Sequence, residues 1–225
     1  MVRLQGVEKT WMEANRITVA SLIISAGAVL CAEIAAGAVA ARSPVNPMIL
    51  LGGVRLLEIA LLLLAALMYG SGLSSVGLAQ SMAARGFGRG LLWCATFGMS
   101  ALIAHLIFIA AGINGMTLIR AHLPRSPDDI ILLFLIGGLV GPAAEEIFFR
   151  GVIYGFFRRW GVFVALTMST FLFILAHPGF PHIPATQAVG GVVFAMAYEI
   201  EESLYAPLTI HVLGNTAIFT LSWIT

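Results

Sequence analysis

The chain has 225 residues, of which 60% are hydrophobic and 10% charged, whereas a soluble domain carries about a quarter charged residues. This composition argues against a soluble fold and predicts a membrane protein. The formal net charge is +1, and basic residues form only short clusters at the edges of apolar stretches, which excludes nucleic acid as a partner.

The first 15 residues are polar, but Leu4, Val7 and Trp11 recur at helical spacing among charged side chains. This pattern predicts a short helix lying at the membrane interface over residues 1–15. The apolar stretch that follows has about 25 residues, which is too long for the core of a cleaved signal peptide. It is therefore predicted to be a retained membrane span.

Seven apolar stretches are candidates to cross a hydrocarbon core of about 30 Å as helices. They cover residues 16–41, 46–70, 90–113, 129–157, 161–177, 185–200 and 204–224, with connections marked by proline and glycine, such as the glycine-rich Gly70–Gly90 region. The sequence thus predicts an all-α, polytopic transmembrane helical bundle of seven spans, with six or eight as alternatives. Residues 1–225 would form a single membrane domain.

Lysine and arginine are more frequent at the span ends on the side of the N-terminus than on the other side. The positive-inside rule therefore predicts a cytoplasmic N-terminus. We expect a multi-pass integral protein of a prokaryotic plasma membrane, with the lipid bilayer as its surroundings.

The fourth predicted span contains two adjacent carboxylates and an arginine, although a charge inside a membrane helix costs at least about 2.5 kcal/mol. Glu146 and Arg150 are four residues apart and share a helix face, so they are predicted to form an ion pair. Glu145 points about 100° away and has no local counter-charge. This position suits a carboxylate that takes up and returns a proton, so Glu145 is the predicted base.

His177 stands before Pro178, which predicts that it ends the fifth helix, with Phe173 one turn earlier to brace its ring. Arg158 and Arg159 mark a shared interface for the fourth and fifth spans. Counted from there at 1.5 Å per residue, Glu145 and His177 both lie roughly 21 to 27 Å away. They are therefore expected to meet at a similar depth.

The last predicted span contains His211 and Asn215, which are four residues apart and share one face. A neutral imidazole and an amide can both donate hydrogen bonds. Two such donors can form an oxyanion hole, in which each is worth about 3 to 4 kcal/mol of transition-state stabilisation.

Other polar residues in the apolar stretches favour structural roles. Arg55 and Glu58 are three residues apart and are predicted to pair, while Glu33 and His105 are expected to line a shared cavity. His182, in the proline-rich loop after His177, is expected at a substrate entrance.

The blocks Glu145-Glu146-x-x-x-Arg150, Phe173-x-x-x-His177 and His211-x-x-x-Asn215 resemble the three motifs of a known family. This is the type II CAAX prenyl protease and bacteriocin-processing (CPBP) family of glutamic intramembrane endopeptidases. The resemblance covers about residues 130–220, which assigns the catalytic core to 129–224, and residues 1–125 carry no matching motif.

The resemblance implies that water, activated by Glu145 and His177, attacks a peptide carbonyl. It also implies that His211 and Asn215 stabilise the oxyanion, and that Glu146, Arg150 and Phe173 support these residues. The expected substrate is a membrane-embedded or lipid-anchored peptide or protein, and no metal or cofactor is implied.

Three other interpretations remain open. A zinc-dependent membrane protease would use Glu and His ligands, although the sequence lacks a His-Glu-x-x-His motif. A non-catalytic immunity or partner-binding protein would keep the fold without the chemistry. A proton-coupled transporter would need inverted repeats, and none is visible. Among substrates, a prenylated C-terminus, a bacteriocin leader and a C-terminal sorting signal, as handled by myxosortase-like relatives, are equally compatible.

Overall fold

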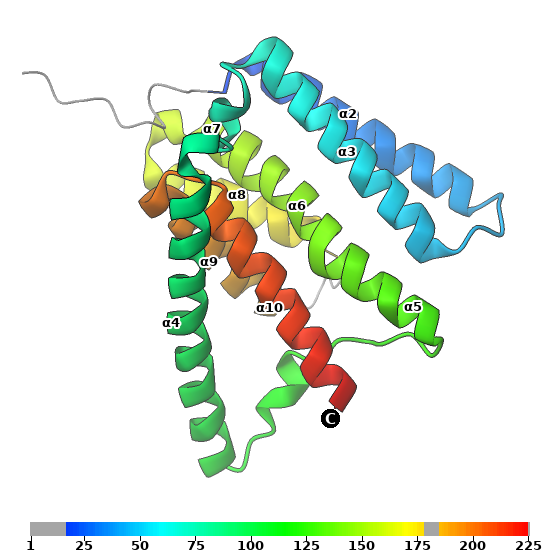
Figure 1. Cartoon of the computed structure of the whole chain (residues 1–225), viewed down its shortest axis with the longest axis vertical. Helices are drawn as coiled ribbons and strands as arrows, with labels where there is room; N and C mark the ends of the chain where they lie inside the picture. The colour runs from blue at the N-terminus through cyan, green and yellow to red at the C-terminus, as the bar shows by residue number, and fades with distance from the viewer. Residues whose placement is uncertain (1–16, 178–184, 225) are drawn as a thin grey trace, which may run out of the picture.

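The computed structural model describes residues 17–177 and 185–224, which form helices and loops without any strand (Figure 1). Six long helices are separated by loops: α2 (Val19–Ala40), α3 (Pro47–Tyr69), α4 (Ala83–Ala110), α8 (Val162–Leu175), α9 (Ala185–Glu201) and α10 (Tyr205–Ile224). A further long helix runs without interruption from α5 (Pro127–Leu132) to Trp160. The predicted all-α class is confirmed.

Each of the seven predicted stretches contains one long helix. Four helices are both long and apolar enough to cross a membrane, namely Val19–Ala40, Pro47–Tyr69, Gln80–Ala110 and Pro127–Trp160, and Val162–Leu175 is a shorter apolar helix. An all-α membrane bundle is thus confirmed, while the count of seven spans and the side of the N-terminus stay predictions. The predicted interfacial segment 1–15 and His182 lie outside the described residues.

The boundary of the third predicted span was wrong, because α4 begins at Ala83 inside the glycine-rich region expected to be a connection. The glycines belong to a helix–helix contact. A Cβ atom at Gly86 would lie 2.6 Å from Ser203 Oγ, and one at Gly90 would lie 2.6 Å from Thr209 Cβ. Small residues spaced by one turn let membrane helices approach closely, which explains why glycine occurs here inside a helix.

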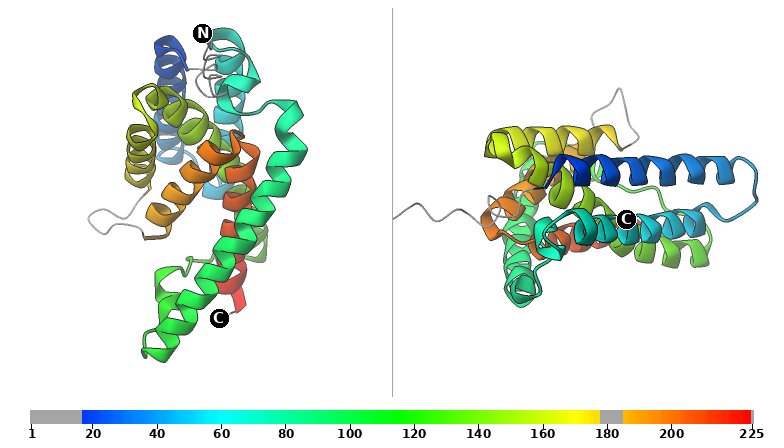
Figure 2. Two further views of the ribbon diagram at one scale, coloured as in Figure 1. Left: turned by 90° about the vertical axis from the view of Figure 1, so that its left-hand side faces the viewer. Right: turned by 90° about the horizontal axis from the view of Figure 1, so that it is seen from above.

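The helix of residues 127–160 is central to the bundle (Figures 1 and 2). The α2–α3 pair packs against one side of it through α3, and α10 packs against another side, with α4 beside α10. The α8–α9 pair contacts its C-terminal half. Large apolar side chains cover the outward faces, as expected for a surface that meets lipid.

The central helix changes its hydrogen-bond register around the predicted site. Its α-helical part α6 (Gly141–Glu146) lies between two π-helical parts, η4 (Leu133–Val140) and η5 (Ile147–Tyr154). Gly141 N–H donates to the carbonyl of Ile136, five residues earlier. Pro142 has no N–H to continue this pattern to Gly137, and π-helical segments of this kind are frequent at functional sites.

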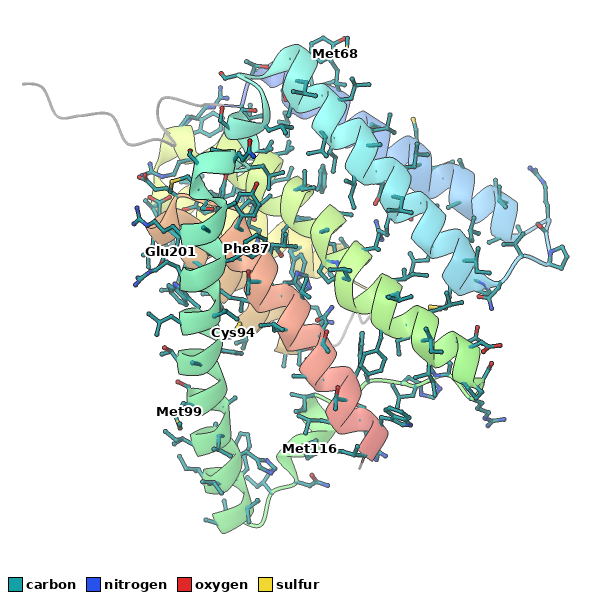
Figure 3. The ribbon with its side chains drawn as sticks, viewed as in Figure 1. Met68, Phe87, Cys94, Met99, Met116 and Glu201 are labelled. Atoms are coloured by element: carbon teal, nitrogen blue, oxygen red, sulfur yellow. The ribbon has the colours of Figure 1, made fainter. Side chains whose placement is uncertain are left out.

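Acidic side chains at the end of α9 tie this helix to its neighbours. Glu201 accepts hydrogen bonds from Arg89 Nε and Trp93 Nε1 of α4, both at 2.9 Å, and Figure 3 shows Glu201 near the start of α4. Glu199 accepts one from Arg158 Nη2 at 2.8 Å. These bonds fix α9 between α4 and the central helix.

Candidate active site

The two adjacent glutamates of the central helix have different surroundings. Glu145 lines a cavity of about 420 Å³, together with residues of α2, α3, α6 and η5 and the two residues that follow α8. Its side chain is 20% exposed, whereas that of Glu146 is completely buried. Helix geometry alone predicted this separation, and it leaves Glu145 as the one of these two carboxylates that a ligand in the cavity can reach.

Two histidines from different helices approach the same oxygen of Glu145. His177 Nε2, at the end of α8, and His211 Nε2, in α10, each lie 3.7 Å from Glu145 Oε2. This distance exceeds that of a direct hydrogen bond, so the three groups surround a small space between them. The structure thus brings together Glu145 and His177, as predicted from their equal depth, and it places His211, the predicted oxyanion donor, beside the same oxygen.

The second ring nitrogen of each histidine fixes its tautomer. His177 Nδ1 donates a hydrogen bond to the carbonyl of Phe173 at 2.8 Å, and His211 Nδ1 donates to Glu146 Oε1 at 2.7 Å. In the neutral ring, the Nε2 atom facing Glu145 therefore carries a lone pair and no proton. His211 can donate to the site only as an imidazolium, which differs from the neutral donor expected from the sequence.

A buried charged cluster holds His211 in place. Arg150 Nη1 donates to Glu146 Oε1 at 3.0 Å, and both side chains have no exposed surface. Arg150 Nη2 also donates to the carbonyl of Gly191 at 3.3 Å. The predicted ion pair is confirmed, and its shared oxygen on Glu146 accepts bonds from both the guanidinium and the imidazole.

Two aromatic rings enclose this cluster. The Phe173 ring lies 4.5 Å from the His177 ring, and the Phe194 ring stacks on His211 at 4.5 Å with an angle of 21°. The Arg150 guanidinium carbon lies 4.5 Å from the centre of the Phe173 ring and 5.1 Å from that of Phe194. Phe173 was predicted as a brace, whereas Phe194 was missed. Its only signal is an aromatic residue among the small side chains of α9.

Asn215 lies one turn after His211 on α10, and its Nδ2 donates to the carbonyl of Gly137 at 2.9 Å. This is the carbonyl that Pro142 cannot serve, because proline lacks the N–H that the π-helical register would direct there. The amide has a second N–H available in principle for a ligand. Its role as an oxyanion donor therefore stays a prediction.

The N-terminal half contributes a second charged cluster to the same cavity. Arg55 Nη1 of α3 lies 2.8 Å from Glu33 Oε1 of α2 and 2.5 Å from Glu58 Oε2, and all three residues line the cavity. The predicted Arg55–Glu58 pair and the placement of Glu33 are confirmed. His105 is not among the lining residues, so its expected place there was wrong.

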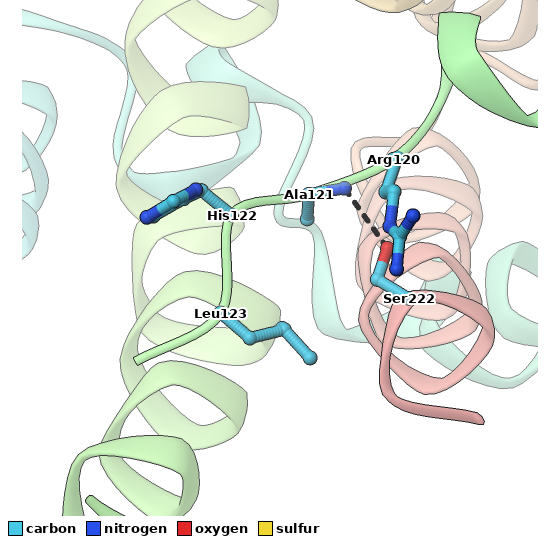
Figure 4. Close-up of a pocket in the computed structure, with 5 residues that line it drawn as sticks. All are labelled: Arg120, Ala121, His122, Leu123 and Ser222. Carbon is cyan, nitrogen blue, oxygen red and sulfur yellow. Dashed lines mark hydrogen bonds between the residues drawn. The ribbon is translucent and has the colours of Figure 1, made fainter. Parts of the chain in front are cut away.

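A second cavity, of about 400 Å³, lies where the connection before α5 crosses the end of α10 (Figure 4). Its lining includes Arg120, His122 and Ser222, and Ala121 N–H donates to Ser222 Oγ at 2.9 Å. None of the predicted site residues lines it. Among the residues that the structure describes, no group of three or more His, Cys, Asp or Glu side chains is placed to hold a metal ion.

In this membrane protein, a carboxylate lies beside two imidazoles next to a cavity of the apolar helical bundle, an arrangement that suits acid–base chemistry. Residues 127–217 match the family model described as type II CAAX prenyl endopeptidase Rce1-like. This segment contains all seven predicted site residues, and the match confirms the resemblance to the CPBP family that the motifs indicate. The C-terminal half of the chain is thus similar to an Rce1-like CAAX protease domain.

Two curated relatives match parts of this chain that are similar in length. The membrane-embedded CAAX protease MroQ of Staphylococcus aureus is 36% identical in an alignment of 92 positions that covers 38% of this chain and 36% of that protein. The candidate membrane peptidase YdiL of Bacillus subtilis is 30% identical over 88 residues, 39% of this chain and 36% of that protein. The chain thus aligns with about a third of each relative, and no solved structure matches it.

Proposed function

We propose that the chain is an intramembrane endopeptidase that hydrolyses a peptide bond of a membrane-associated substrate with a water molecule activated by Glu145. The observation that carries this proposal is the convergence of two imidazole Nε2 atoms, each 3.7 Å away, on one oxygen of Glu145, a residue that lines the cavity. The Rce1-like domain supports the same reaction class. No metal or cofactor takes part in the proposed reaction.

The reaction begins with a water molecule held between Glu145 and the Nε2 atom of His177. Glu145 takes a proton as the water oxygen forms a bond to the peptide carbonyl carbon, which gives a tetrahedral intermediate with an oxyanion. Glu145 then returns this proton to the amide nitrogen, and the carbon–nitrogen bond breaks. The products are a carboxylic acid and an amine, so one water is consumed for each bond cut.

The oxyanion is stabilised by donors on α10 in this mechanism. A proton on His211 Nε2 creates an imidazolium that Glu146 stabilises through Nδ1 and that can donate to the oxyanion. The free N–H of Asn215 is the second proposed donor. Glu146 and Arg150 position the imidazole and do not touch the substrate, much as a carboxylate orients the histidine of a hydrolytic triad.

The proposed mechanism is tested by Glu145→Gln, which keeps the size of the side chain and removes the base. We expect peptide cleavage to fall by about 10²- to 10⁴-fold. The fold should be retained because this side chain reaches into a cavity and no described hydrogen bond depends on it. Asp128→Asn, an equal charge change at an exposed residue, is the matched control and should cleave normally. Retained cleavage by Glu145→Gln would refute the mechanism.

The substrate is proposed to be a membrane-embedded or lipid-anchored peptide or protein. MroQ is named as a CAAX protease, which favours a chain with its cleavage site near a membrane-anchored end. Proteomic comparison of membrane-protein termini between wild type and Glu145→Ala cells would distinguish a prenylated C-terminus, a leader peptide and a C-terminal sorting signal. An unchanged set of termini would favour the non-catalytic alternative, and loss of activity on chelation would favour the zinc enzyme.

A further inference from the structure

The cavity that holds Glu145 has a second wall built outside the family-matched segment. This wall comes from the α2–α3 pair and contains the charged cluster of Glu33, Arg55 and Glu58. The cluster faces the same space as Glu145 and His177. Its residues therefore lie where they can touch a substrate whose scissile bond is at Glu145.

The cavity carries an excess of negative charge. Three carboxylates and one guanidinium line it, which leaves two negative charges when the carboxylates are ionised and His177 is neutral. Both Glu33 and Glu58 already share the same Nη1 atom of Arg55. An incoming anion would be the fourth acidic group in this space, whereas an incoming cation would offset the excess.

One oxygen of this cluster is buried without a partner. The side chain of Glu58 is only 2% exposed, and its Oε1 has no hydrogen-bond partner while Oε2 is bound to Arg55. A buried carboxylate oxygen normally accepts a hydrogen bond, because leaving it unpaired is costly. Glu58 is among the residues that line the cavity, and so is Glu33, which has 44% of its side chain exposed.

We propose that Glu33 and Glu58 bind a lysine or arginine side chain of the substrate and so make a basic residue near the cleaved bond a determinant of specificity. This inference rests on the proposed endopeptidase function for its substrate, but the binding site itself is defined by the cavity. A volume of about 420 Å³ is near the lower end for ligand pockets, so it suits a side chain and a short stretch of peptide.

The binding test uses the full-length chain in lipid nanodiscs with n-butylguanidinium as a mimic of an arginine side chain. Its neutral analogue n-butylurea and the anion butyrate are the comparison probes, and saturation-transfer NMR gives the affinities. We expect n-butylguanidinium to bind at least about tenfold more tightly than n-butylurea, because hydrogen bonds between charged groups are the stronger ones. Equal binding of these two probes, or preferred binding of butyrate at Arg55, would overturn the proposal.

The matched variants are Glu33→Gln, which changes a half-exposed side chain, and Asp128→Asn, which makes the same charge change at an exposed residue away from the cavity. The first should reduce n-butylguanidinium affinity by about tenfold and the second should leave it unchanged. Glu58→Gln is a further variant, to be used where its thermal unfolding matches wild type. No effect of Glu33→Gln would count against the site.

The cleavage test uses the sequences around the protein termini that differ between wild type and Glu145→Ala cells. Each sequence is synthesised as a membrane-tethered peptide. In each peptide, the basic residue nearest the cleaved bond is replaced with norleucine. This replacement should lower kcat/KM by at least about tenfold for the wild-type enzyme and by much less for the Glu33→Gln enzyme. Cleaved peptides without such a residue would overturn the specificity claim. If wild type cleaves no peptide, the endopeptidase proposal fails, and the n-butylguanidinium result still decides the cation site.

Discussion

Two charged clusters of the bundle can be compared directly, because each joins an arginine to a glutamate within one helical turn. In the first, Glu146 and Arg150 are completely buried and His211 is nearly so. In the second, Glu58 is buried, but Glu33 and Arg55 keep part of their surface in the cavity. We refer to them as the closed cluster and the open cluster.

The difference between the clusters lies in what surrounds the arginine. In the closed cluster, Phe173 and Phe194 cover the Arg150 guanidinium, which pairs with Glu146, and Glu146 in turn binds His211. In the open cluster, no aromatic ring is found over Arg55 in the described part of the chain, and the cavity touches all three members. Enclosed charges can position a neighbour, whereas charges that face a cavity can bind a ligand.

The largest effect is expected from breaking the closed cluster. Arg150→Met removes the cation and leaves the Glu146 carboxylate buried without compensation, so the free energy of unfolding should fall by about 3 to 5 kcal/mol. The double variant Glu146→Gln/Arg150→Met should recover much of this stability but little activity, because His211 then lacks its carboxylate. Denaturant titration in mixed micelles measures both. If the single variant Arg150→Met is as stable as wild type, the Glu146 carboxylate is not enclosed as the closed cluster requires.

A smaller effect is expected from removing one of its aromatic covers. Phe194→Leu removes the stacking on His211 and the contact with the Arg150 guanidinium, and should lower the free energy of unfolding by about 1 to 3 kcal/mol. Phe163→Leu is the control, because Phe163 is 81% exposed and should change stability by less than about 0.5 kcal/mol. If both variants lower the free energy of unfolding by the same amount, Phe194 contributes only apolar area to stability.

The contacts of the site that lie within one helix were predictable from the sequence, because they repeat at helical spacing. Glu146 and Arg150 are one turn apart, as are Phe173 and His177, so helix geometry alone brings each pair together. The common depth of Glu145 and His177 followed from counting residues to a shared interface. Helix positions were also predictable, since long apolar stretches leave the backbone no other way to satisfy its hydrogen bonds in lipid.

Contacts between helices that are distant in sequence were not predictable. No periodicity links Phe194 to His211 or assigns the Nδ1 proton of His211 to Glu146, and this bond changes what His211 can donate. The glycines at the start of α4 favour a loop at the level of sequence, because glycine has the same signal in a loop and in a close helix contact. Three-dimensional packing decides between the two.

The third prediction concerns Asn215, which can support either the helix register or the reaction. Asn215→Ala should cost about 1 kcal/mol, the usual value of a hydrogen bond, because the Gly137 carbonyl loses its donor. In a Pro142→Ala background the new N–H can serve this carbonyl, so the same change should cost less. If Asn215→Ala lowers cleavage equally in the wild-type and Pro142→Ala backgrounds, the Asn215 amide has a catalytic N–H in addition to the structural one.

The smallest effect on stability is expected in the open cluster, from Glu33→Gln. Almost half of the Glu33 side chain is exposed, and Arg55 keeps its closer bond to Glu58, so the free energy of unfolding should change by less than about 1 kcal/mol. The same micelle titration, run beside Arg150→Met, gives the contrast directly. A loss as large as that of Arg150→Met would mean that the α2–α3 charges hold the bundle together, and a ligand would then have no free carboxylate to bind.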